Sequence, residues 1–226
     1  MASRPVFIAK NKYPFYEINE VEFDYFPGFA TSQKQKSIRS LHDSFTMKNP
    51  EKNILEISTK STKEIGVSLS AFNLSLNVEG ERICVECAFQ GSKKFENSGP
   101  FSDIYKMNPW EVKKDSRLKE GGAIVSFSLN GEVFGNEPKD FFYNWTYIKA
   151  LYENKEYLEK VKAYSSFTDI EFNPKKSLNC QAKAIAIAIG LMQAGMLEYC
   201  MENKENFLKL VYGEANVMYE QLSLFG

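Results

Sequence analysis

The segment from residue 178 to residue 194 places the strongest constraint on the fold, because it is almost entirely apolar. Alanine and isoleucine alternate through residues 184–190, and this period of two is also found in buried strands. The segment is longer than a typical strand, however, and its surroundings favour a helix. We therefore expect a buried helix that packs closely on its neighbours through its small alanines.

The rest of the chain predicts short strands mixed with helices. Aromatic and polar residues alternate over the first 30 positions and break at Pro14 and Pro27, which indicates strands and turns. Asn130 and Gly131 favour the type I′ turn of a hairpin. Helices are predicted at 32–45, at 139–164 and from 197 to the C-terminus, and strands at 53–58, 69–78, 123–129 and 132–134.

Length and composition indicate a soluble globular protein. The 226 residues are 43% hydrophobic and carry a formal net charge of −1, which favours a single domain spanning residues 1–226. No apolar run approaches the roughly 20 residues of a membrane-spanning helix, and the first residues lack the features of a signal peptide. We expect a cytoplasmic protein that does not bind a membrane.

The cysteines and the single histidine argue against metal chemistry. Four cysteines are too few and too scattered for a disulfide scaffold, so we interpret them as reduced. Cys84 and Cys87 have the spacing of a zinc knuckle or a redox pair, but no second close pair accompanies them. His42 lies in an amphipathic stretch, where a surface position is the favoured interpretation. We expect no metal and no cofactor.

Residues 85–95 carry the pattern most suggestive of function. Wound as a helix, they place Glu86, Gln90 and Lys93 on one face, at positions i, i+4 and i+7. Apolar and small residues on the other positions would seat the helix in a core. A carboxylate, an amide and an amine would then converge on a ligand, although an ordinary solvated helix face fits the same spacing.

Basic residues form three clusters beside polar or aromatic residues. Each cluster alone is typical of a solvated face, and the net charge argues against extended, sequence-independent binding of nucleic acid. Together they make a phosphate-bearing ligand a reasonable hypothesis. The clusters are Lys34, Lys36 and Arg39, then Lys93 and Lys94, and finally Lys175, Lys176 and Lys183.

The chain resembles the NADAR family. The resemblance rests on Ser70-Ala-Phe72, on the Glu86, Gln90 and Lys93 motif, on Asp169, and on Asn179 ahead of an apolar helix. The chain is similar in particular to the subgroup encoded beside DarT-type ADP-ribosyltransferase toxins. Segments 29–37, 53–58, 167–177 and 179–182 carry this closer resemblance, and the matching blocks span most of the chain.

The resemblance implies a compact, mainly helical α+β fold and an antitoxin that counteracts a cognate DarT-type toxin. The implied reaction is hydrolysis of ADP-ribose from the exocyclic amine of guanine in DNA, with the base in a single strand or flipped out of a duplex. Two positions depart from the usual family pattern. Cys87 stands where many members have histidine, and Ala71 stands where many have asparagine, so no role of those side chains carries over.

The resemblance also implies roles for individual residues. Glu86 and Asp169 are the expected catalytic carboxylates, which would stabilise positive charge at the anomeric carbon or activate water. Lys93 is the third expected catalytic residue and either forms a Schiff base with the ribose or binds the pyrophosphate, with Lys176 as its rival. The expected substrate-binding residues are Phe72, Asn73, Gln90, Ser92, Trp145, Lys176, Asn179, Lys34 and Lys36.

Amides and aromatic rings would contribute differently to binding. Gln90 and Asn179 would bind ribose hydroxyls, because an amide supplies both a donor and an acceptor. Structural capping is the alternative for Asn179. Phe72 and Trp145 would stack on adenine or guanine, with core packing at least as well supported for Trp145.

Two other functions remain open. One is an N-glycosidase acting on pyrimidine riboside phosphates of riboflavin synthesis, since enzymes of that kind share the Glu-x-x-x-Gln-x-x-Lys helix. Segments 32–37 and 167–177 favour the toxin-associated subgroup instead. The other is a non-catalytic antitoxin that binds the toxin or sequesters modified DNA.

Overall fold

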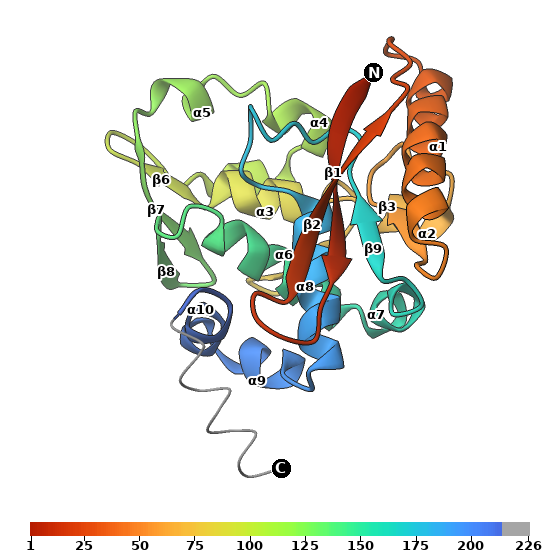
Figure 1. Cartoon of the computed structure of the whole chain (residues 1–226). Coiled ribbons are helices and arrows are strands. Elements are labelled where there is room, and N and C mark those ends of the chain that lie inside the picture. Colours follow the sequence, from red (N-terminus) through yellow and green to blue (C-terminus); the bar gives the residue numbers. More distant parts are fainter. Residues whose placement is uncertain (214–226) are drawn as a thin grey trace.

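Helix α8 (Gln181–Gln193) lies at the centre of the computed structural model, which describes residues 1–213 (Figure 1). Every alanine and isoleucine of this helix is at most 1% exposed. A helix that is apolar on all sides has to be surrounded, whereas a strand would present only two faces. The prediction of a buried helix is confirmed, with its first residue at Gln181 rather than at 178.

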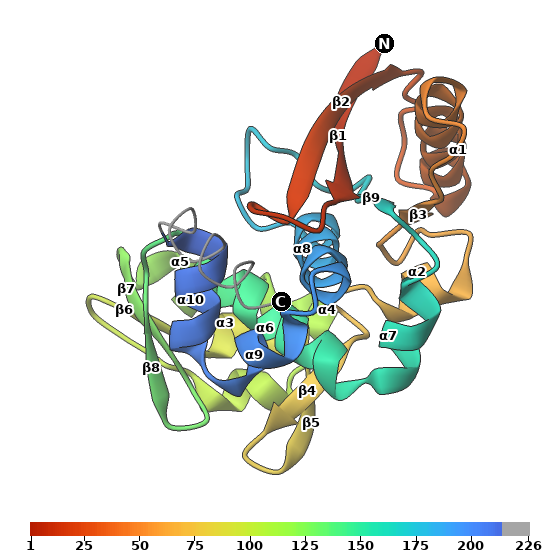
Figure 2. The same ribbon diagram turned by 60° about the horizontal axis from the view of Figure 1, so that its bottom comes forward.

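Four strands form a mixed sheet that packs between α1 and α8 (Figure 2). Along β1, Val6 and Ile8 pack with α1, while Phe7 and Ala9 belong to the larger core around α8. The alternation follows from the period of two along a strand. In the order β2-β1-β9-β3 the strands are β2 (Tyr16–Phe23), β1 (Ala2–Ala9), β9 (Ser166–Thr168) and β3 (Ile54–Glu56), and α1 is Thr31–Lys48.

On the other side of α8 from α1 lie helices α3 and α6 and two small sheets, together with shorter elements (Figure 2). Asn130 and Gly131 have φ angles of 52° and 77°, so the predicted hairpin with its tight turn is confirmed. Together with the first sheet, these elements confirm the α+β class. They are β4 (Ser75–Val78) paired with β5 (Glu81–Cys84), the sheet of β6 (Lys93–Phe95), β7 (Ile124–Leu129) and β8 (Glu132–Gly135), and helices α3 (Val85–Gly91) and α6 (Phe141–Glu153).

The predicted helix over residues 85–95 is shorter than expected. Helix α3 ends at Gly91, and Lys93 belongs to β6, where it pairs with Phe127 of β7. The Gly91 carbonyl accepts a hydrogen bond from the Phe101 amide, and the Ser92 hydroxyl donates back to the Ala88 carbonyl. Strand pairing with a distant part of the chain therefore replaces the last helical turn.

The predicted helix over residues 139–164 is divided in two. The second part is α7 (Lys155–Val161), and Asn154 lies between it and α6. The side-chain amide of Asn154 donates hydrogen bonds through Nδ2 to the backbone carbonyls of Ala150 and of Ser75 in β4. A contact with another element thus ends the first helix.

Shorter elements complete the described part of the chain. The predicted strands at 53–58 and 69–78 are confirmed only as β3 and β4. The remaining elements are α2 (Glu64–Ser68), η1 (Ser102–Lys106), α4 (Pro109–Val112), α5 (Arg117–Glu120), α9 (Leu197–Glu202) and α10 (Lys204–Tyr212). The predicted helical C-terminus extends beyond residue 213 and so lies partly outside the described residues. Within residues 1–213, no helix has the length and apolar character needed to cross a membrane.

Substitution of Gly190 tests whether α8 packs closely against the backbone of the turn after β1. A Cβ atom at this position would lie 2.2 Å from the Phe15 carbonyl oxygen and 2.5 Å from that of Lys10. Because both obstructing atoms belong to the backbone, we expect Gly190→Ala to lower the free energy of unfolding by about 3 kcal/mol in urea denaturation. Gly135→Ala is the control, since its Cβ would meet nothing closer than 3.8 Å. Equal stability of both variants would contradict this packing.

Candidate functional site

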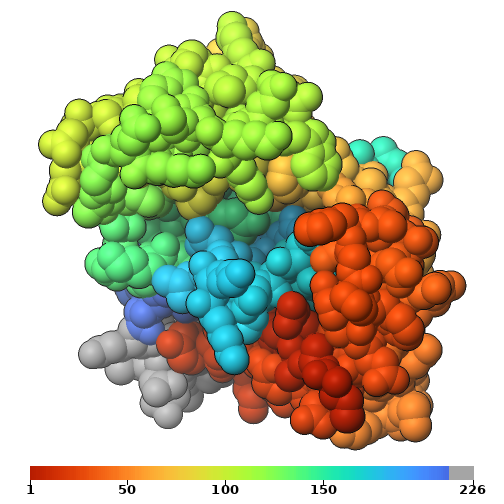
Figure 3. Space-filling view, turned by 90° about the horizontal axis from the view of Figure 1, so that it is seen from above, coloured from red at the N-terminus to blue at the C-terminus, as the bar shows by residue number. Residues whose placement is uncertain are grey.

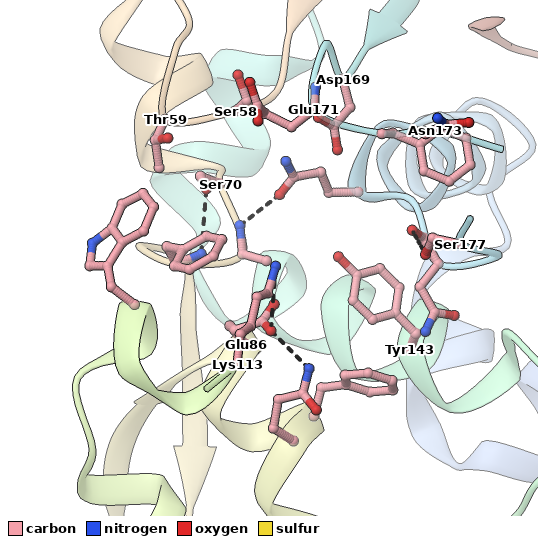
Figure 4. A pocket seen from close by; sticks show the side chains of 18 of the residues that line it. Ser58, Thr59, Ser70, Glu86, Lys113, Tyr143, Asp169, Glu171, Asn173 and Ser177 are labelled. Atoms are coloured by element: carbon pink, nitrogen blue, oxygen red, sulfur yellow. Dashed lines mark hydrogen bonds and ion pairs between the residues drawn. The ribbon is translucent and has the colours of Figure 1, made fainter. Parts of the chain in front are cut away.

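A cleft of about 620 Å³ opens between α3, α4, α6 and the loop that joins β9 to α8. Figure 3 shows the hollow between the yellow-green segment around residues 101–122 and the blue loop before α8. Figure 4 shows Glu86 with Lys113 on one side of the cleft, Asp169 with Glu171 on another, and Tyr143 with Ser177 on a third. Residues far apart in the sequence therefore face the same space.

Glu86, Gln90 and Lys93 form a continuous chain of hydrogen bonds. Gln90 Nε2 donates to Glu86 Oε1 over 2.9 Å, and Lys93 Nζ donates to Gln90 Oε1 over 2.6 Å. Glu86 is only 5% exposed. The predicted convergence of the three side chains occurs even though Lys93 lies beyond the helix. The amide of Gln90 links the carboxylate to the amine and orients both.

Burial changes the acidity of Lys93. Desolvation lowers the pKa of this lysine to about 8, and the charge of Lys113 adds to the decrease, whereas the charge of Glu86 opposes it. Lys93 Nζ also lies 4.7 Å from the centre of the Phe89 ring. The amine is thus enclosed by an aromatic ring and an amide, and it loses its proton more readily than a surface lysine.

Asp169 lies in the same cleft, at the start of the loop after β9. Its Oδ1 accepts a hydrogen bond of 3.0 Å from the Glu171 amide. Burial raises the pKa of Asp169 to about 8, and the charge of Glu56 contributes to the increase. The Asp169 carboxyl therefore keeps its proton to a higher pH than a solvated aspartic acid does.

Glu56 is a buried carboxylate directly behind the cleft, and it was not predicted from the sequence. Its Oε1 accepts hydrogen bonds from the Ser58 hydroxyl and the Ile170 amide, and its Oε2 accepts one from the Thr168 hydroxyl. Thr168 and Ile170 are the two neighbours of Asp169, so Glu56 holds the backbone on both sides of that residue. Burial raises the pKa of Glu56 as well, and its three hydrogen-bond donors act in the opposite direction.

His42 belongs to the same buried network. Its Nε2 lies 2.8 Å from the Thr168 hydroxyl, and burial lowers the pKa of the histidine to about 4. His42 is half-buried rather than exposed, because α1 packs against the sheet, so the interpretation of His42 as a surface residue is only partly correct. Cys84, by contrast, caps α3 by accepting the Cys87 amide hydrogen bond at its sulfur.

Gln181 joins α8 to two walls of the cleft. Its Oε1 accepts a hydrogen bond from the Ala71 amide, and its Nε2 donates to the Ile57 carbonyl. Just before it, Asn179 Oδ1 is buried without a hydrogen-bond partner among the described residues. An unpaired buried acceptor is costly, so a donor on a bound ligand would stabilise this position.

An aromatic pair and two lysines form the wall next to Glu86. Trp110 of α4 stacks on Phe72, with ring centroids 4.4 Å apart and an angle of 22° between the planes. Lys113 Nζ lies 4.7 Å from the centre of the Phe72 ring and 3.7 Å from Glu86 Oε1. Lys60 Nζ lies 5.9 Å from the Trp110 ring. Lys113 thus connects the aromatic wall to the buried carboxylate.

The cleft brings together most of the residues predicted to act on a substrate and leaves the others outside. Asn73 donates to the Val67 carbonyl, Ser92 is buried with its hydroxyl on the Ala88 carbonyl, and Trp145 packs edge-on against Phe207 in the core. These three side chains do not line the cleft. The predicted residues that do line it are Glu86, Lys93, Asp169, Phe72, Gln90, Lys176 and Asn179.

The two predicted lysines of α1 lie apart from the cleft. Lys34 Nζ is 3.2 Å from Glu171 Oε1 and 3.3 Å from the Tyr25 hydroxyl, so it contacts a cleft residue without lining the cleft. Lys36 lines a second, shallower hollow of about 380 Å³ along α1. Sequence reasoning placed both in one basic cluster, but successive helix positions point in different directions.

Other residues of the cleft were not predicted as site residues, among them Trp110, Lys113, Tyr143 and Gln181. Trp110 and Lys113 are three positions apart, a spacing that predicts one helix face, but they lie in a polar segment without a recognisable motif. The sequence around Tyr143 gives even less indication of a functional role, because this residue lies in a run of aromatic residues that is typical of a core.

Comparison with known families shows to which family the chain belongs. A model of the DarT1-associated NADAR antitoxin family matches residues 2–221, nearly the whole chain. The protein therefore belongs to the DarT1-associated NADAR antitoxins, and a DarT1-type toxin is its functional partner. No curated protein matches the chain.

Glu56 offers a test of how the cleft is supported. Glu56→Ala leaves three buried donors without an acceptor, and we expect it to lower the free energy of unfolding by about 3 kcal/mol or more. Glu56→Gln keeps the shape and should cost less than half as much. Glu22→Ala, an exposed acid on β2, is the control for removal of a carboxylate. A urea midpoint for Glu56→Ala equal to that of the wild type would contradict the supporting role.

Proposed function

We propose that this antitoxin removes ADP-ribose from the exocyclic amine of guanine in DNA by hydrolysing the N-glycosidic bond. The observation that carries the proposal is the chain of hydrogen bonds from Glu86 to Lys93, which ends at a lysine whose pKa is lowered to about 8. Asp169 lines the same cleft with a pKa raised to about 8. Membership of the DarT1-associated antitoxins supports the antitoxin role, and the resemblance of the motif supports ADP-ribosylated guanine as the substrate.

Lys93 is the nucleophile of the proposed reaction. With a pKa of about 8, about one-tenth of this lysine is neutral at pH 7, roughly 300 times the fraction at its ordinary pKa. The neutral amine attacks the anomeric carbon of the ribose, and the bond from that carbon to the guanine amine breaks. Glu86 stabilises the positive charge that develops on the carbon and on the lysine nitrogen.

Asp169 is the general acid. The electron pair of the broken bond goes to the guanine nitrogen, which takes the proton of Asp169. As the ribose ring opens, one proton of the lysine nitrogen passes to the ring oxygen and leaves a protonated Schiff base. Water hydrolyses this intermediate to free ADP-ribose, Lys93 recovers its neutral amine, and the released proton returns to Asp169. The net reaction consumes one water molecule.

Other cleft residues hold the substrate. Gln90 uses its oxygen and one N–H on Lys93 and Glu86, so only its second N–H remains for a ribose hydroxyl. The unpaired Oδ1 of Asn179 accepts a second hydroxyl. Lys176, exposed on the rim of the cleft, binds the pyrophosphate. Lys93 is thereby free for the covalent step.

Trapping with borohydride tests the covalent step. Single-stranded DNA carrying ADP-ribosylated guanine should yield a stable adduct of protein and ADP-ribose when sodium borohydride is added during turnover, because the reductant converts the Schiff base to an amine. Mass spectrometry should place the adduct on Lys93, and Lys93→Ala should abolish it. Lys94→Ala is the matched control, since the neighbouring strand position points to the opposite, exposed face.

Three outcomes would overturn parts of this proposal. An adduct that survives Lys93→Ala excludes Lys93 as the nucleophile. Release of ribose phosphate from pyrimidine riboside phosphates, with no activity on modified DNA, identifies a different N-glycosidase. If Glu86→Gln still restores guanine and still neutralises the toxin in cells, Glu86 has no catalytic role and the protein acts by another route.

The two shifted pKa values predict a bell-shaped pH profile. Activity rises with pH as Lys93 loses its proton around pH 8, and falls as Asp169 loses its own proton around the same pH. We expect kcat/KM to be highest near pH 8. Asp169→Asn, which has no proton to give, should lower kcat by about 100-fold or more and remove the alkaline decline. A wild-type profile that stays flat from pH 6 to pH 10 would contradict both assignments.

A further inference from the structure

Trp110 is the most exposed aromatic residue of the cleft, with 54% of its surface accessible. It belongs to the four-residue helix α4, whose start is fixed by a hydrogen bond from the Trp110 amide to Asn108 Oδ1. A large apolar ring on a cleft rim is a candidate contact for a ligand. The proposed mechanism does not use it.

Phe72, its partner, is already in contact with two side chains. The indole of Trp110 stacks on it at a centroid distance of 4.4 Å. The Lys113 ammonium lies 4.7 Å from the centre of the same ring. The exposed ring of Trp110 is therefore the more accessible surface for stacking, while the prediction that Phe72 stacks on a base stays a prediction.

The outer part of Trp110 is open and positively charged. Lys60 Nζ stands 5.9 Å from the ring centre, at the outer limit of a cation–π contact, and its flexible side chain can move aside when a ring stacks on the indole. The side chain of Lys113 is 55% exposed, and its ammonium lies 3.7 Å from Glu86 Oε1. A flat ring joined to a negatively charged backbone fits a surface of this kind.

We propose that Trp110 stacks on a nucleobase of the single strand next to the modified guanine, with Lys60 near the phosphate between them. This inference rests on the proposed function. Trp110 stands on the exposed rim, whereas Glu86 and Lys93 lie deep in the cleft, so a base at Trp110 belongs to the strand leading out of the site. Lys113 links the stacked pair of Trp110 and Phe72 to Glu86, because its ammonium contacts both the Phe72 ring and the Glu86 carboxylate.

Two substrates test the proposal: ADP-ribosylated guanosine and a single-stranded oligonucleotide that carries the same modification. We expect Trp110→Ala to lower kcat/KM for the oligonucleotide about tenfold and to leave hydrolysis of the nucleoside unchanged, because one stacked base is lost. Trp110→Phe should retain most of the activity on both. Tyr13→Ala removes an exposed aromatic ring that does not line the cleft and serves as the control.

The outcomes separate this proposal from the proposed function. If wild-type protein hydrolyses neither substrate, the proposed function fails. If it hydrolyses both and Trp110→Ala affects them equally, the ring instead contacts ADP-ribose or supports the fold, and the stacking proposal is wrong. No loss on either substrate also overturns it.

Fluorescence gives a second readout that does not depend on Trp110→Ala folding. The chain has two tryptophans, and Trp145 is only 7% exposed. Unmodified single-stranded DNA should quench the wild-type emission by stacking on Trp110. Quenching should persist in Trp145→Phe and disappear in Trp110→Phe. Wild-type emission that does not respond to single-stranded DNA would contradict the proposal.

Discussion

The burial of α8 on all sides is the constraint on which the rest of the structure depends. Its alanines and isoleucines contact the β1 sheet on one side and α6 on the other, so neither layer can shift without exposing the helix. At its far end, Gly190 lies against the backbone of the turn after β1. At its start, Gln181 bonds to Ala71 and Ile57 and so fixes two walls of the cleft. The packing of one helix thereby sets the width of the site.

The site depends on a balance of charges in a poorly solvated space. Glu86, Lys93 and Asp169 are enclosed, and enclosure drives the pKa values of a lysine and an aspartic acid toward each other, to about 8 in both cases. Glu56 supports this arrangement from behind, because its three donors hold the carboxylate in place and its charge contributes to the raised pKa of Asp169. Such arrangements cost stability and are typical of functional sites.

Much of the fold could be predicted from local pattern, and the failures have one cause. The buried helix, α1 and the Asn130 hairpin follow from periodicity and turn chemistry, which act over a few residues. The helix over 85–95 and the helix over 139–164 were predicted too long. In both cases a hydrogen-bonding partner from a distant segment, β7 or the Ser75 carbonyl, ended the helix. Periodicity carries no information about such partners.

Residue type and spacing were enough to predict the central helix, the Glu86, Gln90 and Lys93 motif and the family to which the chain belongs. The packing of the chain was needed to show which lysine loses its solvation, that Trp110 rather than Trp145 reaches the cleft, and that Glu56 lies behind Asp169. Desolvation and charge coupling depend on distances between segments more than 100 residues apart, such as those joined by the hydrogen bond from Ile170 to Glu56. Those distances are set by how α8 and the sheets pack.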